Sequence, residues 1–437
     1  MECIVEPERE TPISHRVDAV IVGGGPGGFP AAVAAARNGA NTLLVEQYGF
    51  LGGMATAGLV NPFMSFHAGE EQIIEGIFQE LRERLEALGG GSGCGDPRSF
   101  NAEVFKIAAE QMCLEAGVKL LYHTIFVDSH VTGDRIDGII VENKSGRTAI
   151  MAQVVVDATG DADVAARAGV PVEIGRPEDG ATQPMTLFFY VADVDTEKME
   201  NYFCDHPEDR GFLSFVEEAT RNGDLQLKRE NILLFKLPQK GQIAVNSTRI
   251  VGVDGTRAEE LTRAEIEGRK QVMMLMRFFR KYLPGFQQSY LLAIAPQVGV
   301  RETRRIVGEY VMTAEDVLQG KKFNDVIARG AYGIDIHNPK GKGSTVRYLK
   351  PGTSYDIPYR CLVPLEIENL LVAGRPISAT HEAHSAIRIM PQCMAIGQAA
   401  GTAAALALQT GVPPRKVGIA QLQTALISQG ANLGRGR

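Results

Sequence analysis

The chain has 437 residues and a formal net charge of −7 at pH 7, with 44% hydrophobic and 22% charged residues. This is the composition of an ordinary globular protein with room for two domains, and its acidic balance disfavours nucleic-acid binding. No run of about 18 apolar residues is present, so the sequence predicts no membrane span. Residues 1–16 lack the apolar core of a signal peptide, and we expect a cytoplasmic protein.

The six cysteines are scattered along the chain and form no C-x-x-C pair. This spacing argues against an iron–sulfur cluster or a zinc site, and it fits free thiols in a reducing compartment. We therefore predict no metal site. The sequence leaves open whether the chain forms a homo-oligomer.

The first motif is a glycine-rich turn that follows a short apolar segment. Residues 17–22 are apolar and mostly β-branched, which predicts a buried parallel strand. Gly23, Gly25 and Gly28 then stand in the spacing G-x-G-x-x-G. The first glycine permits a tight turn, the second lets the backbone approach a pyrophosphate, and the third lets the next helix pack closely on the strand. Pro26 lies in the same loop, and we expect it to contact the molecule that carries this pyrophosphate.

The segments after this turn complete a dinucleotide-binding pattern. A helix is predicted over 27–38, with its positive N-terminus directed at the phosphates. A strand over 41–45 ends in Glu46, and a carboxylate at this place accepts hydrogen bonds from ribose hydroxyls. Glycine-rich turns are common, but the strand, helix and acid together favour a dinucleotide over a purely structural turn.

A loop and two helices follow. The loop after the strand is expected to line the cofactor through Gln47, Gly53, Met54 and Thr56. Amphipathic spacing predicts a helix over 71–88, and a further helix is predicted over 101–116. The glycines at 89–95 could be taken for a second phosphate loop. No strand precedes them and no Lys-Ser/Thr pair follows, so we expect a connector.

Short strands then lead to a second contact with the cofactor. They are predicted over 119–122, 124–127, 136–141 and 149–156. The last of them runs into the sequence Ala158-Thr159-Gly160-Asp161, which brings another glycine to the cofactor. We expect Val127, Ala158 and Gly160 to contact it.

The segment from about Val170 to Lys350 has a different character. Strand-like runs at 185–191, 231–237, 242–250 and 298–310 alternate with helices. The longest helix is predicted to begin at a capping box formed by Thr262 and Glu265, and to end before Pro284. We expect an inserted α+β domain whose strands pair in an antiparallel sheet.

The end of the chain carries the second fingerprint. A strand over 369–373 runs into Gly374 and Arg375, and a helix is predicted over 391–409. Backbone N–H groups at a strand end can hold a phosphate or a ribityl chain, and a helix N-terminus stabilises negative charge on a reduced flavin. The residues expected to contact the cofactor here are Gly374, Arg375, Pro391, Gln392, Met394 and Ala395.

In this order, the blocks resemble the FAD-dependent oxidoreductases of the glutathione-reductase superfamily. They are most similar to the bacterial group usually called FAD-dependent oxidoreductase, which is distantly similar to fumarate reductase flavoproteins. Segments 301–310, 332–341 and 380–392 also resemble blocks of that group. The resemblance covers nearly the whole chain. It implies FAD, an α/β fold with a doubly wound, Rossmann-like FAD-binding domain (1–170 and 355–437), and an inserted α+β substrate domain (171–354).

Two positions depart from the resemblance. Fumarate reductases often attach FAD covalently to a histidine just before a Gly-Gly pair, and the matching segment 46–53 contains none, so we expect non-covalent FAD. The usual acid after the closing glycine is replaced by Arg375, which puts in doubt a carboxylate contact with the ribityl chain. A second G-x-G-x-x-G for NAD(P)H is also missing from the inserted segment, which argues against a disulfide reductase.

The candidate catalytic and substrate-binding residues are mainly histidines and arginines. A flavin dehydrogenase needs a base for the substrate proton, and His381 and His384 lie between the last strand and the flavin-facing helix. An arginine facing the flavin would clamp a substrate carboxylate, and the candidates are Arg388 and Arg301. The alternative for each is a structural hydrogen bond or a surface ion pair. Further pocket candidates are Glu382, His337, Asp335, Tyr359, Arg360 and His67.

The sequence thus predicts an FAD-dependent oxidoreductase that transfers a hydride between a small polar metabolite and FAD. One alternative is an electron-transfer flavoprotein subunit that passes electrons to a partner protein or a quinone. The other is a non-catalytic member that keeps the fold for binding, against which the retained phosphate-loop glycines argue. The substrate, the direction of reaction and the electron acceptor are left open.

Overall fold

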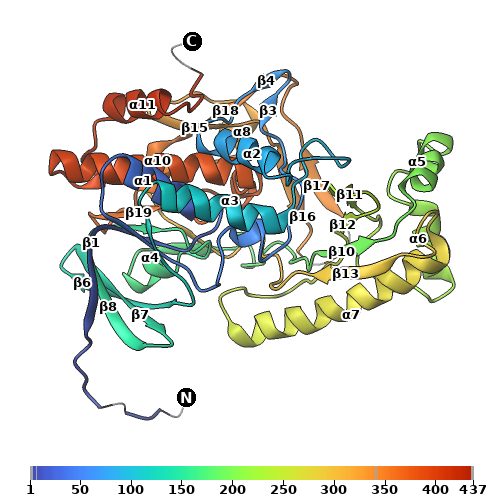
Figure 1. Cartoon of the computed structure of the whole chain (residues 1–437), viewed down its shortest axis with the longest axis horizontal. Coiled ribbons are helices and arrows are strands. Elements are labelled where there is room, and N and C mark those ends of the chain that lie inside the picture. Colours follow the sequence, from blue (N-terminus) through green and yellow to red (C-terminus); the bar gives the residue numbers. More distant parts are fainter. Residues whose placement is uncertain (1–2, 6, 340, 342, 435–437) are drawn as a thin grey trace.

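The computed structural model describes residues 3–5, 7–339, 341 and 343–434. Figure 1 shows two groups of elements side by side. The larger group carries both ends of the chain, and the smaller is dominated by the long helix α7 (Ala258–Tyr282).

The larger group is built on a sheet of seven strands. Its parallel part has the order β5, β2, β1, β8 and β19. On the side of β8, β7 pairs antiparallel with β8, and β6 pairs antiparallel with β7. This parallel order, with helices packed on the sheet, is the Rossmann-like arrangement that the sequence predicts. The strands are β1 (Ile13–Val22), β2 (Thr42–Val45), β5 (Lys119–Leu121), β6 (Ile125–Thr132), β7 (Arg135–Asn143), β8 (Gly146–Asp157) and β19 (Leu370–Val372).

The first motif, after β1, and the second, after β19, meet where α1 (Gly28–Arg37) packs along α10 (Met390–Thr410). Glycines permit this close approach. A Cβ at Gly397 would lie 2.1 Å from the carbonyl oxygen of Gly27, and one at Gly401 would lie 2.0 Å from that of Ala31. The small residues late in the chain therefore bring the last helix against the phosphate-loop helix, next to the same sheet edge.

The smaller group contains a four-stranded antiparallel sheet, as predicted, in the order β11, β12, β10 and β13. Its core is a separate cluster of buried side chains drawn mainly from residues 185–300. The elements are β10 (Phe189–Ala192), β11 (Leu234–Lys236), β12 (Ile243–Val245), β13 (Tyr290–Ile294), α5 (Thr196–Asp205), α6 (Leu213–Arg221) and α7. Buried side chains from Ile306 to Ile334 pack instead in the core of the larger group, and the domain boundaries stay a prediction.

The remaining elements connect the two groups or cover the larger one. The helices are α2 (Ile77–Ala87), α3 (Ala102–Glu115), α4 (Asp163–Arg167), α8 (Ala314–Leu318), α9 (His381–Ile387) and α11 (Ile419–Ser428). The short strands are β3 (His67–Ala68), β4 (Glu71–Gln72), β9 (Val172–Ile174), β14 (Arg304–Ile306), β15 (Val326–Gly330), β16 (Ile334–His337), β17 (Ser344–Arg347) and β18 (Tyr355–Pro358). In the described part of the chain, no helix combines the length and apolar character that crossing a membrane requires.

Three predicted elements differ in the structure. The helix predicted over 71–88 begins only at Ile77, because Gly76 has a φ of 65° and the preceding residues 71–72 form β4. The predicted capping box at Thr262 is wrong: α7 begins at Ala258, and the Thr262 hydroxyl donates to the Ala258 carbonyl oxygen at 2.8 Å inside the helix. The strand predicted over 298–310 is wrong except for residues 304–306, which pair with β9.

Candidate active site

A cleft of about 770 Å³ lies at the carboxyl ends of the parallel strands. Its lining includes Gly23 after β1, Glu46 after β2, Ala158 after β8 and Gly374 after β19. Thr186 and Asn246, from the segments around the antiparallel sheet, line the opposite side. Ligands of open α/β sheets bind at this edge, where the strand order reverses. The cleft is therefore the candidate site for both cofactor and substrate.

The three glycines of the phosphate loop have different roles. Gly23 and Gly28 allow close packing within the protein, whereas Gly25 leaves room for a ligand. Gly23 has a φ of 98°, and a Cβ on it would lie 2.5 Å from the Ala158 carbonyl oxygen. A Cβ on Gly28 would lie 1.7 Å from the Gly23 carbonyl oxygen. A Cβ on Gly25 would meet nothing closer than the Cα of Gly53 at 3.7 Å, and Gly25 lines the cleft. Protein packing thus explains the first and third glycines, whereas the second fits a pyrophosphate.

The N-terminus of α1 is suited to an anion from outside the protein. Its N-cap, Gly27, provides no side-chain hydrogen bond, and its first turn contains no acidic residue. The positive end of the helix is therefore not neutralised by the helix's own side chains, although the N–H groups of Gly28 and Phe29 donate to the Gly25 carbonyl oxygen at 2.9 and 3.2 Å. Together with the space at Gly25, this arrangement fits the diphosphate of FAD.

Glu46 is held rigidly at the edge of the cleft. Its carboxylate oxygens accept hydrogen bonds from the backbone N–H of Gly24 at 2.6 Å and of Tyr48 at 2.9 Å. Burial raises the pKa of Glu46, and the hydrogen bonds from neighbouring backbone N–H groups oppose that shift. The carboxylate keeps lone pairs that can accept ribose hydroxyls, as the sequence predicts.

A carboxylate also stands beside the closing glycine, although the residue after it is an arginine. Arg375 pairs with Asp161 (Nη2 to Oδ1, 2.7 Å) and donates from Nη1 to the Val300 carbonyl oxygen at 3.0 Å. The Thr303 hydroxyl donates to the same Asp161 oxygen at 2.6 Å. Both Asp161 and Arg375 line the cleft. The acid beside the closing glycine therefore comes from the end of β8.

Most of the residues expected to contact FAD lie in the lining of the cleft. Those in the lining are Gly23, Gly25, Pro26, Glu46, Gln47, Gly53, Met54, Ala158, Gly160, Gly374 and Arg375. Those outside it are Gly28, Thr56, Val127, Pro391, Gln392, Met394 and Ala395. Their contact with FAD stays a prediction.

Helical geometry explains some of these exceptions. The Thr56 hydroxyl is turned to the Leu51 carbonyl oxygen at 2.7 Å. At the start of α10, Met390 and Cys393 line the cleft, since residues three apart share a helix face, while Pro391 and Gln392 are buried outside the lining. On β6, Ile125 and Phe126 line the cleft, and Val127 does not.

The other end of the cleft is polar and cationic. Arg301, Arg388, Tyr332, Asp335 and His337 all line it. The Tyr332 hydroxyl donates to Asp335 at 2.9 Å, and the ring nitrogen Nε2 of His337 lies 3.7 Å from the same carboxylate. Burial and the nearby arginines lower the pKa of His337, so its imidazole is neutral. The sequence indicated four of these residues, all but Tyr332, as candidates among many, and the fold brings them to one place.

The two histidines favoured by the sequence lie behind this lining. His381 is 3% exposed, and its Nδ1 lies 2.8 Å from Oε1 of the fully buried Glu302. The same oxygen accepts from Arg305 at 2.6 Å. His384 is fully buried, and burial together with nearby cations lowers its pKa well below its ordinary value. Neither ring belongs to the described lining of the cleft.

The remaining pocket candidates also lie elsewhere. The hydroxyl of buried Tyr359 donates to the Pro414 carbonyl oxygen at 2.9 Å, and Arg360 pairs with Asp325 at 2.9 Å. Glu382 and His67 are not part of the cleft lining either. No group of three or more metal-ligating side chains occurs within the described residues.

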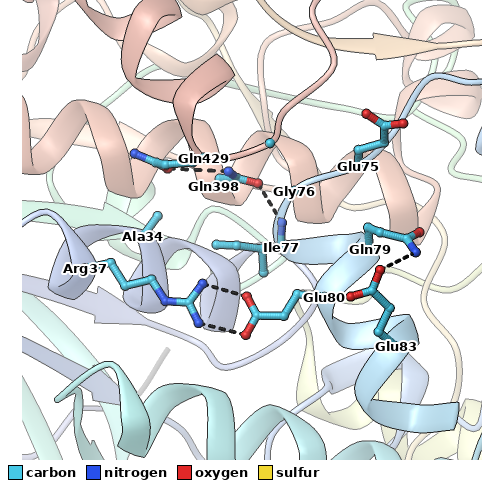
Figure 2. A pocket seen from close by; sticks show the side chains of 11 residues that line it. Ala34, Arg37, Glu75, Gly76, Ile77, Gln79, Glu80, Glu83, Gln398 and Gln429 are labelled. Atoms are coloured by element: carbon cyan, nitrogen blue, oxygen red, sulfur yellow. Dashed lines mark hydrogen bonds and ion pairs between the residues drawn. The ribbon is translucent and has the colours of Figure 1, made fainter. Parts of the chain in front are cut away.

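A second, smaller pocket of about 410 Å³ lies between α1, α2 and α10. Figure 2 shows that most of its polar side chains are directed at one another, whereas Glu75 points away from the others. Arg37 forms two hydrogen bonds with Glu80, at 2.6 and 2.8 Å, and Gln398 accepts the backbone N–H of Ile77 at 3.0 Å. These contacts join the three helices to one another. The polar side chains of this pocket therefore hold the helices together.

Curated proteins match part of this chain. Over 160 residues it is 31% identical to the thiamine thiazole synthase of Methanococcus vannielii, which covers 34% of this chain and 58% of that protein. The thiamine thiazole synthase of Sulfolobus acidocaldarius is 34% identical over 183 residues, 38% of this chain and 63% of that protein. The chain therefore spans less than two thirds of the length of these curated relatives.

Solved structures give weaker similarity over more of the chain. A geranylgeranyl bacteriochlorophyll reductase-like protein from Thermoplasma acidophilum is 13% identical, with a TM-score of 0.43 over 96% of this chain and 84% of that one. L-proline dehydrogenase from P. horikoshii is 12% identical, with a TM-score of 0.44 over 95% and 99%. The profile of the family named FAD dependent oxidoreductase matches residues 18–426. The chain therefore belongs to the FAD dependent oxidoreductase family and is an enzyme that uses FAD.

Proposed function

We propose that this enzyme transfers a hydride between a small polar organic metabolite and non-covalently bound FAD. The proposal depends on one observation, which is that a single cleft contains both a phosphate-loop end and a cationic end. A phosphate-loop end contains Gly25 and the uncapped N-terminus of α1, and a cationic end contains Arg301 and Arg388. FAD supplies a two-electron acceptor, and the chain's own residues bind and orient the substrate.

Arg301 is arranged to hold an anion. Its Nη1 donates to the Pro184 carbonyl oxygen and to the Thr186 hydroxyl, both at 2.6 Å, which fixes the plane of the guanidinium at the cleft wall. Burial, and then repulsion by Arg388 and other arginines, lower the pKa of Arg301 to about 9. A bound carboxylate would relieve this repulsion and accept two parallel hydrogen bonds.

The geometry favours His337 as the group that accepts the substrate proton. It lines the cleft, whereas His381 is bound to Glu302 behind the lining. The neutral imidazole can accept a proton, and its Nδ1 lies 3.0 Å from the Ser344 hydroxyl. An anionic substrate would oppose the effect of the arginines and raise the pKa of His337 toward its ordinary value. His381, the base that the sequence favours, is the alternative assignment.

The two assignments make different predictions. Replacing the true base should lower the rate of flavin reduction roughly 10²- to 10⁴-fold with unchanged FAD content. We expect this loss in His337→Ala and not in His381→Ala. The reverse result would move the base to His381, and wild-type rates in both variants would remove both histidines from proton transfer.

Within the family, we propose that the chain lies nearest the glutathione-reductase superfamily members, with a distant relation to fumarate reductase flavoproteins. Residues 1–170 and 355–437 form the FAD-binding domain of this proposal, and 171–354 form the substrate domain. The three blocks that carry the likeness meet in the cleft.

Anaerobic screening of metabolites tests the proposal. The FAD-loaded enzyme is mixed with single metabolites without oxygen, and its flavin absorbance is recorded. Bleaching by a small polar metabolite, reversed by the oxidised product, is the expected result. The phosphate-loop variant Gly25→Val is the matched control, since it should carry no FAD. An FAD-loaded enzyme that no small metabolite reduces, but that a partner flavoprotein or quinone does, would overturn the proposal.

A further inference from the structure

Four arginines gather at the cationic end of the cleft, and their arrangement bears on the substrate of the proposed function. Arg301 and Arg388 line the cleft, while Arg229 and Arg249 are 7% and 5% exposed and stand behind the lining. All four act electrostatically on His337, which places them around one small volume. They come from four separate segments of the chain.

The partners of these arginines are neutral oxygens. Arg301 donates to the Pro184 carbonyl oxygen and the Thr186 hydroxyl, and Arg249 donates to the carbonyl oxygens of Asn338 and Gly343 at 3.1 and 2.8 Å. Arg229 donates to the carbonyl and side-chain oxygens of Asn231, and Arg388 donates to Oε1 of Gln183 at 3.4 Å. None of the four lies within 4.0 Å of a carboxylate of the described residues. By contrast, the buried Arg305 pairs directly with Glu302 at 2.6 Å.

The cluster also contains donors without an acceptor. Among the described residues, Nε of Arg249, Nε of Arg388 and Nε2 of Gln183 are buried and make no hydrogen bond. A buried donor left unsatisfied costs about 1–3 kcal/mol, and more for a charged group. A ligand that accepts hydrogen bonds here would remove that cost.

The charge around the cluster is not balanced by protein. The carboxylates that act electrostatically on Arg229, Arg249 and Arg301 are Asp335 and Glu230, and Glu230 is exposed to solvent. Buried charges are ordinarily paired, because desolvation of an unpaired ion costs several kcal/mol. The arginines of the cluster therefore outnumber the carboxylates that act on them, and a ligand with two negative charges would reduce that surplus.

We propose that the substrate is a small organic acid with two negatively charged groups, held by Arg301 and Arg388 and by the field of Arg229 and Arg249. This inference rests on the proposed function and narrows its substrate class. Each acidic group is a carboxylate or a phosphate, since both accept paired hydrogen bonds from a guanidinium. A neutral metabolite or a monocarboxylate would leave part of the cluster unpaired.

The test is done on the FAD-loaded enzyme, so that the FAD phosphates already occupy their own site. Acetate, malonate and inorganic phosphate are titrated separately, and binding is followed by the change in flavin absorbance and by calorimetry. Malonate or phosphate should bind roughly tenfold or more tightly than acetate, the range for one added hydrogen bond to a charged group. The tighter of the two dianions identifies the source of the acidic groups. Equal binding of all three probes, or binding of none, would overturn the proposal.

Charge-removing variants locate the site. Arg301→Gln and Arg388→Gln should each weaken binding of the tighter dianion roughly tenfold or more, with unchanged FAD content. Arg301→Lys keeps the charge but loses the planar fork, so it should fall between wild type and Arg301→Gln. The control Arg277→Gln removes an exposed charge on α7 and should bind like wild type. Loss of FAD affinity without loss of dianion affinity would show that the cluster serves the cofactor instead.

The two proposals fail in different ways. An FAD-loaded enzyme that a neutral metabolite reduces, and that shows no preference for dianions, keeps hydride transfer and refutes the dianionic substrate. An enzyme that binds dianions through these arginines, but whose flavin is reduced only by a partner protein or quinone, refutes hydride transfer from a metabolite.

Discussion

Replacing Gly25 should separate FAD binding from folding. In the structure a Cβ on Gly25 has 3.7 Å of clearance, and the φ of this residue lies outside the left-handed region. Gly25→Ala should therefore leave the FAD-free protein as stable as wild type, or about 0.4–1 kcal/mol more stable, because alanine restricts the unfolded chain. The same methyl group enters the space that fits the pyrophosphate.

The expected loss of affinity follows from that intrusion. Forcing one methyl group into a filled site costs about 1–3 kcal/mol, which raises the dissociation constant of FAD roughly 5- to 150-fold. Gly25→Val adds two further carbons and should abolish detectable binding. FAD titration of the FAD-free protein, followed by quenching of flavin fluorescence, measures the first effect, and thermal unfolding of the same samples measures stability.

Gly28→Ala is the matched control, three residues away in the same loop. Its Cβ would lie 1.7 Å from the Gly23 carbonyl oxygen, so the backbone must shift and the melting temperature should fall even without FAD. Wild-type FAD affinity in both Gly25 variants would refute the placement of the pyrophosphate. A large loss of stability in Gly25→Ala without FAD would show instead that the loop needs this glycine for folding.

Three further predictions concern the cofactor, the reductant and the core. The purified protein should be yellow and release intact FAD on denaturation, and flavin that precipitates with the chain would contradict non-covalent binding. NADH and NADPH should be poor reductants, whereas rapid stoichiometric bleaching at micromolar concentrations would reveal a nicotinamide site. Glu302→Ala should lower the free energy of unfolding by about 3–5 kcal/mol in denaturant titrations, because it leaves Arg305 buried without its partner. Glu115→Ala, which removes an exposed partner of Arg84, should change it little, and equal effects would refute this reasoning.

The sequence alone determined the cofactor half of this protein. Strand 17–22, the glycine spacing after it and Glu46 act over short stretches of chain, where apolar periodicity and backbone freedom fix the local structure. The structure adds which backbone the glycines of α10 meet, namely that of α1 and the residue before it. Predictions of element ends failed where a single residue interrupts a pattern, as Gly76 does before α2.

Only the tertiary structure decided which polar side chains face one another. Burying a charge requires a partner, and that partner can lie anywhere in the chain. Glu302 draws His381 and Arg305 into the core, although the sequence placed His381 among the candidates near the flavin. Asp161 reaches Arg375 from another strand end and supplies a carboxylate that the closing motif lacks. The arginine cluster likewise forms from four distant segments, because local patterns set the direction of a side chain but not the charge it will meet.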